Sequence, residues 1–141
     1  MRIRPATAED RMDVFSLARS FQSAFSSLKE FDTTFCGLLD SRDHRIWIAE
    51  DRGTVVGWLH AFIALRVGIG PFIEIGGLVV KEDYRRGGVG SALVHESAEW
   101  ARSEGMALRV RCHSEREETH GFYKAFGFKL LKPQFVFELN R

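Results

Sequence analysis

The most constraining feature of the sequence is a glycine-rich stretch between two segments of different periodicity. Seven of the thirteen glycines fall within 68–90, and three of them lie in the sequence RRGGVG at 85–90. The segment 72–80 is apolar and predicts a strand, whereas 89–103 has apolar residues at helical spacing. A second apolar segment, 108–112, follows. Strand, helix and strand in this order form a βαβ unit, which requires a parallel strand pair and a crossover.

The remaining segments extend this unit to a mixed α/β fold in one domain, residues 1–141. Gly105 and Gly127 are expected to end the two helices that precede them. The other expected strands are 2–4, 45–49, 55–65 and two short strands flanking Pro133, and the other expected helices are 8–21, a weaker one around 31–39, and 115–126.

Composition excludes several classes of protein. Twenty Lys and Arg against nineteen Asp and Glu leave a net charge of +1, which disfavours nucleic acid as a partner. The longest apolar stretch, 55–65, is too short for a membrane span. Cys36 and Cys112 are too few for a disulfide framework and have no metal-ligand spacing, which favours a reducing cytoplasm. We therefore expect a cytoplasmic protein with no metal, nucleic-acid or membrane partner.

The glycine-rich stretch is suited to binding a phosphate. Glycine has no Cβ, so backbone N–H groups can converge on an anion. The helix that follows adds unsatisfied N-terminal donors and the positive end of its dipole. A tight turn carrying two solvated arginines is the alternative, and the loop by itself does not distinguish the two.

Two known phosphate-binding loops do not fit this stretch. A P-loop requires Gly-Lys-Ser/Thr, which is absent. A dinucleotide fingerprint that starts at Gly88 continues to Gly90 but then meets Leu93 where a third glycine belongs. Both are excluded.

A third signature does fit. Arg85-x-x-Gly88-x-Gly90, preceded by the strand end LVV at 78–80, resembles the (Q/R)xxGx(G/A) motif of the GCN5-related N-acetyltransferase (GNAT) superfamily. The sequence FYKAFGF at 122–128 resembles that family's FYxxxGF segment, and the opening residues are similar to its N-terminus. The resemblance covers essentially the whole chain. It implies an α/β fold with a central mixed sheet of about six to seven strands, about four helices and a splayed parallel strand pair.

The resemblance also implies a binding site for acetyl-CoA as cosubstrate. The pantetheine arm would pair with the backbone of the strand end, and the amides of 86–91 would bind the diphosphate. Gly76 and Gly77 suit a bulge that would splay the strands, with close packing as the alternative. The cofactor-binding residues expected on this basis are Leu78, Val79, Val80, Arg85, Arg86, Gly87, Gly88, Val89, Gly90 and Ser91.

Acetyl transfer from a thioester to an amine needs two proton movements. The amine, with a lysine-like pKa of about 10.4, must lose a proton, and the leaving thiolate must be protonated. The resemblance makes Tyr123 the general acid. Glu74 is the candidate base, because a carboxylate within an apolar strand costs desolvation energy unless it is paired or opens to a cleft. The alternatives are a packed tyrosine, a solvated edge glutamate and an ordered water as base.

One segment departs from the common family pattern. Arg116-x-x-Thr119-His120 replaces the usual Asn-x-x-Ala and is closer to a variant in branches that acetylate small amines such as aminoglycosides. His120 either lines the site or packs. His44, His60 and His95 show no metal-ligand spacing and are interpreted as surface or satisfied core residues.

The function that the resemblance implies is transfer of an acetyl group to the primary amine of a small molecule by direct attack in a ternary complex. The sequence identifies neither the acceptor nor the oligomeric state, although dimers are frequent among relatives and a homodimer is one possible state. A non-catalytic acyl-CoA-binding regulatory module and the acetylation of a protein amine are the alternatives.

Overall fold

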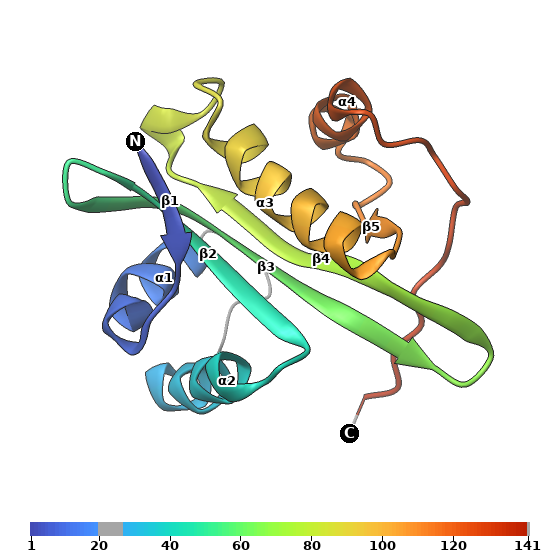
Figure 1. Cartoon of the computed structure of the whole chain (residues 1–141), viewed down its shortest axis with the longest axis horizontal. Helices are drawn as coiled ribbons and strands as arrows, with labels where there is room; N and C mark the ends of the chain where they lie inside the picture. Colours follow the sequence, from blue (N-terminus) through green and yellow to red (C-terminus); the bar gives the residue numbers. More distant parts are fainter. Residues whose placement is uncertain (20–26, 141) are drawn as a thin grey trace. The chain divides into compact units, whose positions relative to one another are not determined.

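The structure is a computed structural model that describes residues 1–19 and 27–140. The chain forms two compact units, Met1–Val110 and Arg111–Arg141 (Figure 1). None of the described helices combines the length and apolar character needed to cross a membrane.

The larger unit is built on a five-stranded sheet in which the strands follow their order in the chain. Neighbouring strands are antiparallel from the first to the fourth, and the fourth pairs with the fifth in parallel. The strands are β1 (Arg2–Pro5), β2 (His44–Asp51), β3 (Thr54–Arg66), β4 (Ile69–Val80) and β5 (Leu108–Val110).

Helices cover both faces of this sheet (Figure 1). One face packs against α1 (Arg11–Ala18) and α2 (Leu28–Asp40) through a core of apolar side chains. The other face packs against α3 (Val89–Glu104), where Trp47 of β2 contacts Trp100 with ring centroids 6.1 Å apart. The core on the first face consists of Val14, Phe31, Phe35, Ile46, Ile48, Trp58 and Val79.

The predicted βαβ unit is confirmed as β4, α3 and β5. The buried residues of α3 occupy one face at i, i+4, i+5, i+8, i+11 and i+12, as in an amphipathic helix. Gly105 ends the helix with φ +66°, a left-handed conformation that glycine adopts without a steric penalty. The expected helix 89–103 thus begins at the observed residue and ends one residue before the observed end, Glu104.

The parallel pairing of β4 with β5 is short. It comprises Ile73 with Leu108, Glu74 with Arg109 and Ile75 with Val110, whereas β4 continues to Val80. Along 76–80, β4 has a strand neighbour on only one side among the described residues. This is the expected parting of the parallel pair.

The predicted bulge lies where the two strands part. His60 of β3 pairs with Gly77 and Ala61 pairs with Ile75, so Gly76 is the extra residue. A Cβ at Gly76 would approach the His60 ring to 2.8 Å, and one at Gly77 would approach the Trp58 ring to 3.0 Å. Close packing thus favours glycine at both positions, and Gly76 is also the bulge residue.

The smaller unit consists of α4 (Glu117–Phe126) and an extended segment. Gly127, with φ +125°, ends the helix as expected. Two sequence predictions need correction. The first helix is shorter than 8–21, because a 3₁₀ turn at Ala8–Asp10 precedes α1, and residues 20 and 21 lie outside the described part.

The second correction concerns the sheet, which has five strands among the described residues instead of about six to seven. The segments that flank Pro133 have strand-like composition but no strand partner, and 128–140 contains no regular element. A strand requires a ladder of hydrogen bonds to a neighbour, and composition does not supply one. The side chains of Leu130, Leu131, Phe135, Val136, Phe137 and Leu139 are accordingly exposed.

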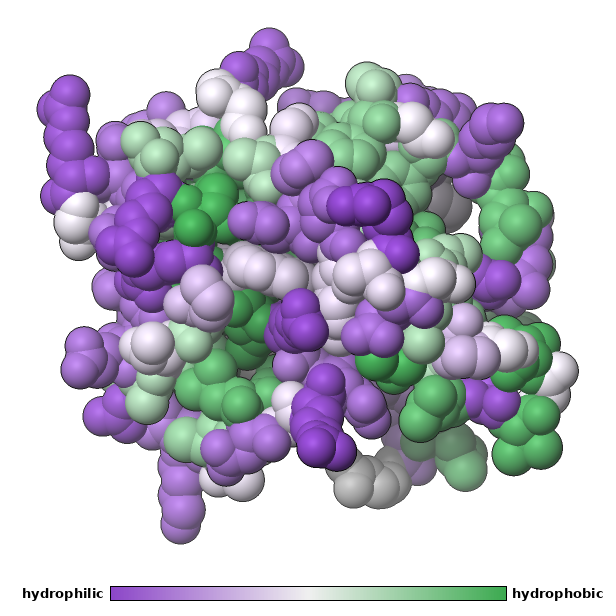
Figure 2. Space-filling model, in the orientation of Figure 1, coloured by the Kyte–Doolittle hydropathy of each residue, from purple (hydrophilic) through white to green (hydrophobic). Residues whose placement is uncertain are grey.

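In the view of Figure 2, hydrophilic side chains are spread over the surface and hydrophobic ones form separate groups between them.

Candidate active site

The loop between β4 and α3 carries the predicted anion-binding residues. A 3₁₀ turn, Glu82–Tyr84, leads into 85–88, where Arg86 and Gly88 have φ values of +65° and +87°. Gly88 is the N-cap of α3, and no side chain caps this helix end. The first bond of the α3 turn joins the Ala92 N–H to the Gly88 carbonyl oxygen at 3.0 Å. The N–H groups of 89–91 precede this bond, so they are suited to bind an anion.

Three hydrogen bonds fix this loop to the sheet. The Lys81 N–H donates to the Val56 carbonyl oxygen at 2.7 Å, and the Tyr84 hydroxyl donates to Asp51 Oδ2 at 2.9 Å. Arg85 Nε donates to the Val80 carbonyl oxygen at 3.3 Å. The hydrogen bond to Asp51 raises the pKa of Tyr84 because it favours the protonated phenol.

The loop side chains divide by exposure. Arg85, Arg86, Gly87 and Gly88 are exposed, whereas the Val89 side chain is only 4% exposed. Val89 therefore offers its N–H group and not its side chain. The exposed guanidinium groups add positive charge to the end of the loop.

Glu74 lies on β4 one residue before the point where the parallel pairing ends. Its neighbours Ile73 and Ile75 are buried on the α3 face, so the half-buried Glu74 side chain lies on the α1–α2 face. Register places it beside Phe62 of β3 and Arg109 of β5.

Two arginines stack on the ring of Phe72, which lies two residues before Glu74 on the same face. The guanidinium carbon of Arg109 lies 4.2 Å from the centre of the Phe72 ring, and that of Arg66 lies 5.3 Å from it. These contacts hold Arg109 on the α1–α2 face of the sheet.

Two histidines that sequence reasoning assigned to surface or core packing meet on the same face. His44 Nδ1 and His60 Nε2 are 2.9 Å apart, and the two rings stack at 14°. The Phe62 ring stacks against both, with centroids 5.3 Å from His44 and 5.6 Å from His60. Burial, and secondarily the charge of His44, lowers the pKa of His60 to about 4.

The hairpin turn between β2 and β3 can be recognised in the sequence, but it does not determine which side chains face each other. Asp51 pairs with Thr54 across the turn, and a bulge at 49–50 shifts the register so that His44 pairs with Phe62. His60 then occupies the next position on the same face and lies diagonally opposite His44. Counting outward from the turn without the bulge misplaces the pair by one residue.

Tyr123 lies on α4 in the smaller unit. Its ring packs edge-on against Phe122 at 5.0 Å and Phe128 at 5.2 Å, and 7% of its surface is exposed. Burial, and secondarily the charge of Cys112, raises the pKa of the Tyr123 hydroxyl. The phenol therefore keeps its proton at neutral pH and is a hydrogen-bond donor.

His120 and Arg116 have structural contacts in the smaller unit. His120 Nε2 lies 2.8 Å from the His113 carbonyl oxygen, which can only accept, so Nε2 carries the proton. Arg116 is the N-cap residue of α4, and its carbonyl oxygen accepts from the His120 N–H at 3.1 Å.

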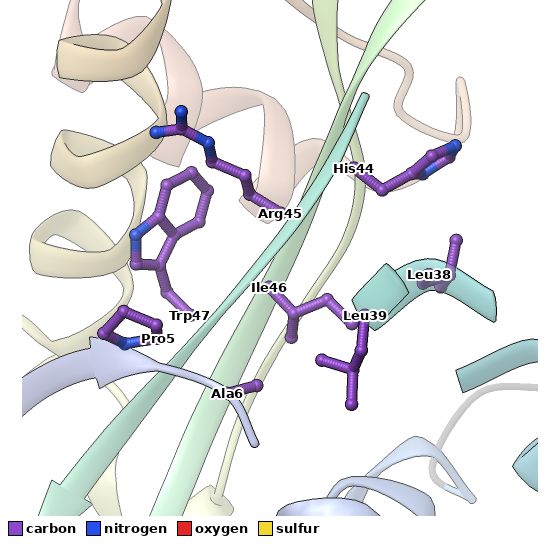
Figure 3. Close-up of a pocket in the computed structure, with 8 residues that line it drawn as sticks. All are labelled: Pro5, Ala6, Leu38, Leu39, His44, Arg45, Ile46 and Trp47. Carbon is purple, nitrogen blue, oxygen red and sulfur yellow. The ribbon is translucent and has the colours of Figure 1, made fainter. Parts of the chain in front are cut away.

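A hollow of about 300 Å³ lies along the edge of β2 near the end of α2 (Figure 3). None of the predicted catalytic or cofactor-binding residues lines it, although His44 does. Its lining residues are Pro5, Ala6, Leu38, Leu39, His44, Arg45, Ile46 and Trp47. Within 1–19 and 27–140, no three His, Cys, Asp or Glu side chains are grouped to hold a metal ion.

Solved structures share this fold along their whole length. Aminoglycoside antibiotic 6'-N-acetyltransferase AAC(6')-IG from Acinetobacter haemolyticus is 20% identical with a TM-score of 0.85, over 100% of this chain and 99% of that chain. AAC(6')-Iy, in complex with the bisubstrate analog CoA-S-monomethyl-acetylneamine, is 18% identical with a TM-score of 0.85, over 99% and 97%. A transcriptional regulator from Bacillus halodurans C-125 is 18% identical with a TM-score of 0.87, over 98% and 99%.

A comparison with curated proteins found no match. A family model described as the acetyltransferase (GNAT) family matches residues 11–128, which include the glycine-rich loop and the FYKAFGF segment. The match extends over both compact units and most of the chain. The resemblance found in the sequence is thereby confirmed: the chain belongs to the acetyltransferase (GNAT) family.

Proposed function

We propose that this chain transfers the acetyl group of acetyl-CoA to the primary amine of a small molecule by direct attack in a ternary complex. The observation that carries this proposal is that an open strand edge, a glycine-rich loop and an uncapped helix start follow one another in a single chain segment. β4 loses its parallel neighbour after Ile75, continues with one open edge to Val80, and leads through the glycine-rich loop to the uncapped start of α3.

The loop would hold the diphosphate of acetyl-CoA. The amides of 86–91 supply donors, the helix end supplies partial positive charge, and Arg85 and Arg86 supply full charges. The positive φ of Gly88 supports this role, because it turns the chain into the helix without a side chain over the amides.

The open edge of β4 would hold the pantetheine arm. An extended ligand can pair with the unpaired edge of a strand as another strand would. The backbone of Leu78, Val79 and Val80 offers that edge, while the Val79 side chain is buried in the core. From the loop, the arm would run back along β4, so that the thioester lies near Gly76, where the pairing with β5 closes the path.

Glu74 is the proposed base, acting directly or through an ordered water. The amine nitrogen attacks the thioester carbonyl carbon, the C–N bond forms and the C–S bond breaks, and the amine proton passes to the carboxylate. Glu74 lies two residues from Gly76 on the α1–α2 face. That short distance along the strand supports its assignment.

Tyr123 is the proposed general acid toward the sulfur. Its raised pKa keeps the proton on the hydroxyl, but a thiolate with a pKa of about 8.5 is a weaker base than such a phenolate. The main contribution of Tyr123 is therefore a hydrogen bond to the sulfur as its negative charge develops. The coenzyme A thiolate then takes up a proton from solvent as the product leaves.

The small-amine acceptor is supported by the fold and by the segment before α4. AAC(6')-IG and AAC(6')-Iy are aminoglycoside N-acetyltransferases of the same fold, and residues 116–123 read RxxTHxFY, close to the variant found in such branches. We treat 1–141 as one catalytic domain, because the family model crosses both units. The free thiols of Cys36 and Cys112 fit a reducing cytoplasm.

A regulatory acyl-CoA-binding module is the second candidate, and the transcriptional regulator from Bacillus halodurans of the same fold favours it. One experiment separates the two candidates. Purified protein is mixed with acetyl-CoA and a panel of aminoglycosides, polyamines, amino acids and peptides, and free thiol is recorded while calorimetry measures CoA binding. We expect amine-dependent thiol release. Binding without release for every amine would contradict the enzyme and support the module, and the absence of binding would contradict both.

A further inference from the structure

The His60 ring has one nitrogen paired and the other directed at the bulge. Nε2 lies 2.9 Å from His44 Nδ1. A side chain placed on Gly76 would begin 2.8 Å from His60 Nδ1 and 3.1 Å from Cε1. Nδ1 therefore lies against the Gly76 backbone, and no described residue hydrogen-bonds to it.

The bulge at Gly76 is where the thioester is expected under the proposed function, on which the present inference rests. The pairing of Ile75 with Val110 closes the path between β4 and β5. On the α3 face, Ile75 and Leu59 are 4% and 0% exposed, so that face has no room for a ligand. Gly76 is exposed and has no side chain, which leaves the α1–α2 face as the way out of the sheet.

We propose that His60 Nδ1 binds the acceptor amine, accepting a hydrogen bond from one amine N–H beside the thioester, and that His44 fixes the tautomer that makes this possible. Two neutral imidazoles that face each other across one hydrogen bond share a single proton there. When His60 Nε2 carries it and His44 Nδ1 accepts it, His60 Nδ1 is a free lone pair. His44 is thus a positioning residue and His60 a binding residue.

The electrostatics of the face keep His60 in the accepting form. With its pKa lowered to about 4, His60 is neutral at physiological pH and does not repel an ammonium ion. The groups that share its face include His44 on β2, Arg66 on β3, Glu74 on β4 and Arg109 on β5. The charged residues on the helices packed against this face are Arg11 and Asp13 of α1 and Lys29, Glu30, Asp32 and Asp40 of α2.

His60 and Glu74 together would recognise two N–H groups of one nitrogen. Glu74 pairs with Phe62, whose ring stacks on His60, so the two acceptors approach the bulge from neighbouring strands. One N–H binds to the imidazole while the carboxylate takes the proton that is lost. A primary amine can satisfy both acceptors, and a secondary amine in its neutral, attacking form can satisfy only one.

The test measures steady-state kinetics of the wild type and three variants with a primary amine that is turned over, and with its N-methyl derivative. His60→Phe keeps an aromatic ring in the stack but removes the acceptor. His44→Asn keeps an oxygen acceptor near the Nδ1 position, whereas His44→Leu removes it. Comparison of the two His44 variants separates the effect of losing the tautomer from the effect of losing packing.

We expect His60→Phe to raise the KM for the primary amine about three- to tenfold, as for one lost hydrogen bond, with the KM for acetyl-CoA within about twofold of wild type. His44→Leu should raise the amine KM in the same way and His44→Asn should restore it. The wild type should prefer the primary amine to its N-methyl derivative, and His60→Phe should reduce that preference.

Each outcome is decisive. Turnover in the wild type, with an amine KM unchanged in His60→Phe, overturns the inference but leaves the proposed function. A wild type that releases no thiol with any amine overturns both. If His60→Phe does not fold, equal amine KM values for His44→Leu and His44→Asn overturn the inference, and a split between them supports it.

Discussion

Arg4 and Asp10 form a two-pronged ion pair that ties the first strand to the start of the first helix. Arg4 Nη1 donates to Asp10 Oδ2 and Nη2 donates to Oδ1, each at 2.8 Å. Asp10 Oδ2 also accepts from the Thr7 N–H at 2.8 Å, and Arg4 Nε donates to Glu50 of β2 at 3.0 Å. This network joins β1, the 3₁₀ turn and β2 at a position where Asp10 is only 5% exposed.

We expect Asp10→Asn to lower the free energy of unfolding by about 2–3 kcal/mol, because it leaves a partly buried guanidinium without its carboxylate. Hydrogen bonds from Arg4 are the main cause of the lowered pKa of Asp10. A carboxyl with a lowered folded-state pKa stabilises the fold above its unfolded pKa and loses this effect as the pH falls through the folded value. Urea unfolding between pH 3 and pH 7 measures both effects.

The difference between wild type and Asp10→Asn should thus be complete above about pH 5 and shrink toward pH 3. Arg2→Met, on an exposed residue of the same strand, is the control and should change stability by less than about 0.5 kcal/mol. A difference that stayed constant over this pH range would show that the ion pair is not its source.

Gly88→Ala should weaken CoA binding, whereas Gly87→Ala should not. Gly88 has φ +87°, and nothing lies within 4 Å of an added Cβ, so the whole penalty is backbone strain of about 1–2 kcal/mol. An added Cβ at Gly87 would reach the Tyr84 carbonyl oxygen at 3.4 Å, an ordinary contact. Calorimetry with CoA and thermal unfolding would measure both variants, and equal CoA affinities would argue against the amide cradle.

Tyr123→Phe should lower kcat by about 10²-fold with CoA affinity nearly unchanged, because the hydroxyl would act only on the developing thiolate. The raised pKa of Tyr123 also predicts no loss of kcat from phenol ionisation up to about pH 10. Tyr84→Phe is the matched control. It removes the hydrogen bond to Asp51 that holds the loop and should weaken CoA binding while leaving kcat within about twofold.

Rate measurements over pH would check the role of Tyr123 directly. A kcat for Tyr123→Phe equal to that of the wild type would remove the residue from the mechanism.

Glu74→Gln should reduce kcat/KM for the amine by about 10²-fold at pH 7, with partial recovery as the pH approaches the amine pKa of about 10.4. The recovery is expected because an amine that is already neutral needs no base. Glu99→Gln is the control, since Glu99 lies exposed on α3 and pairs with Arg102. A loss that did not diminish at high pH would assign Glu74 to binding instead of proton removal.

Local features of the fold could be predicted from sequence because short-range physics decides them. Glycine at 88, 105 and 127 marks positive φ at helix ends, and the apolar spacing of 89–103 marks a buried helix face. The order of strand, loop and helix then required a parallel pair. The family motif lies wholly within this local unit and the segment at 122–128, so it too could be recognised from the sequence alone.

The pairing of His44 with His60 depended on tertiary structure. Sixteen positions separate these residues, and a bulge at 49–50 decides which side chains face each other. The prediction of two strands around Pro133 was wrong for the same reason. The composition of this segment suits a strand, but no described strand pairs with it.

The sequence by itself thus determined the elements, their order and the anion-binding loop, since each of these depends on residues within a few positions of one another. Tertiary structure alone decided which acceptors face the bulge at Gly76 and how many strands the sheet has. The physical reason is that strand pairing and register are contacts between distant segments, and a one-residue shift moves every side chain to the opposite face.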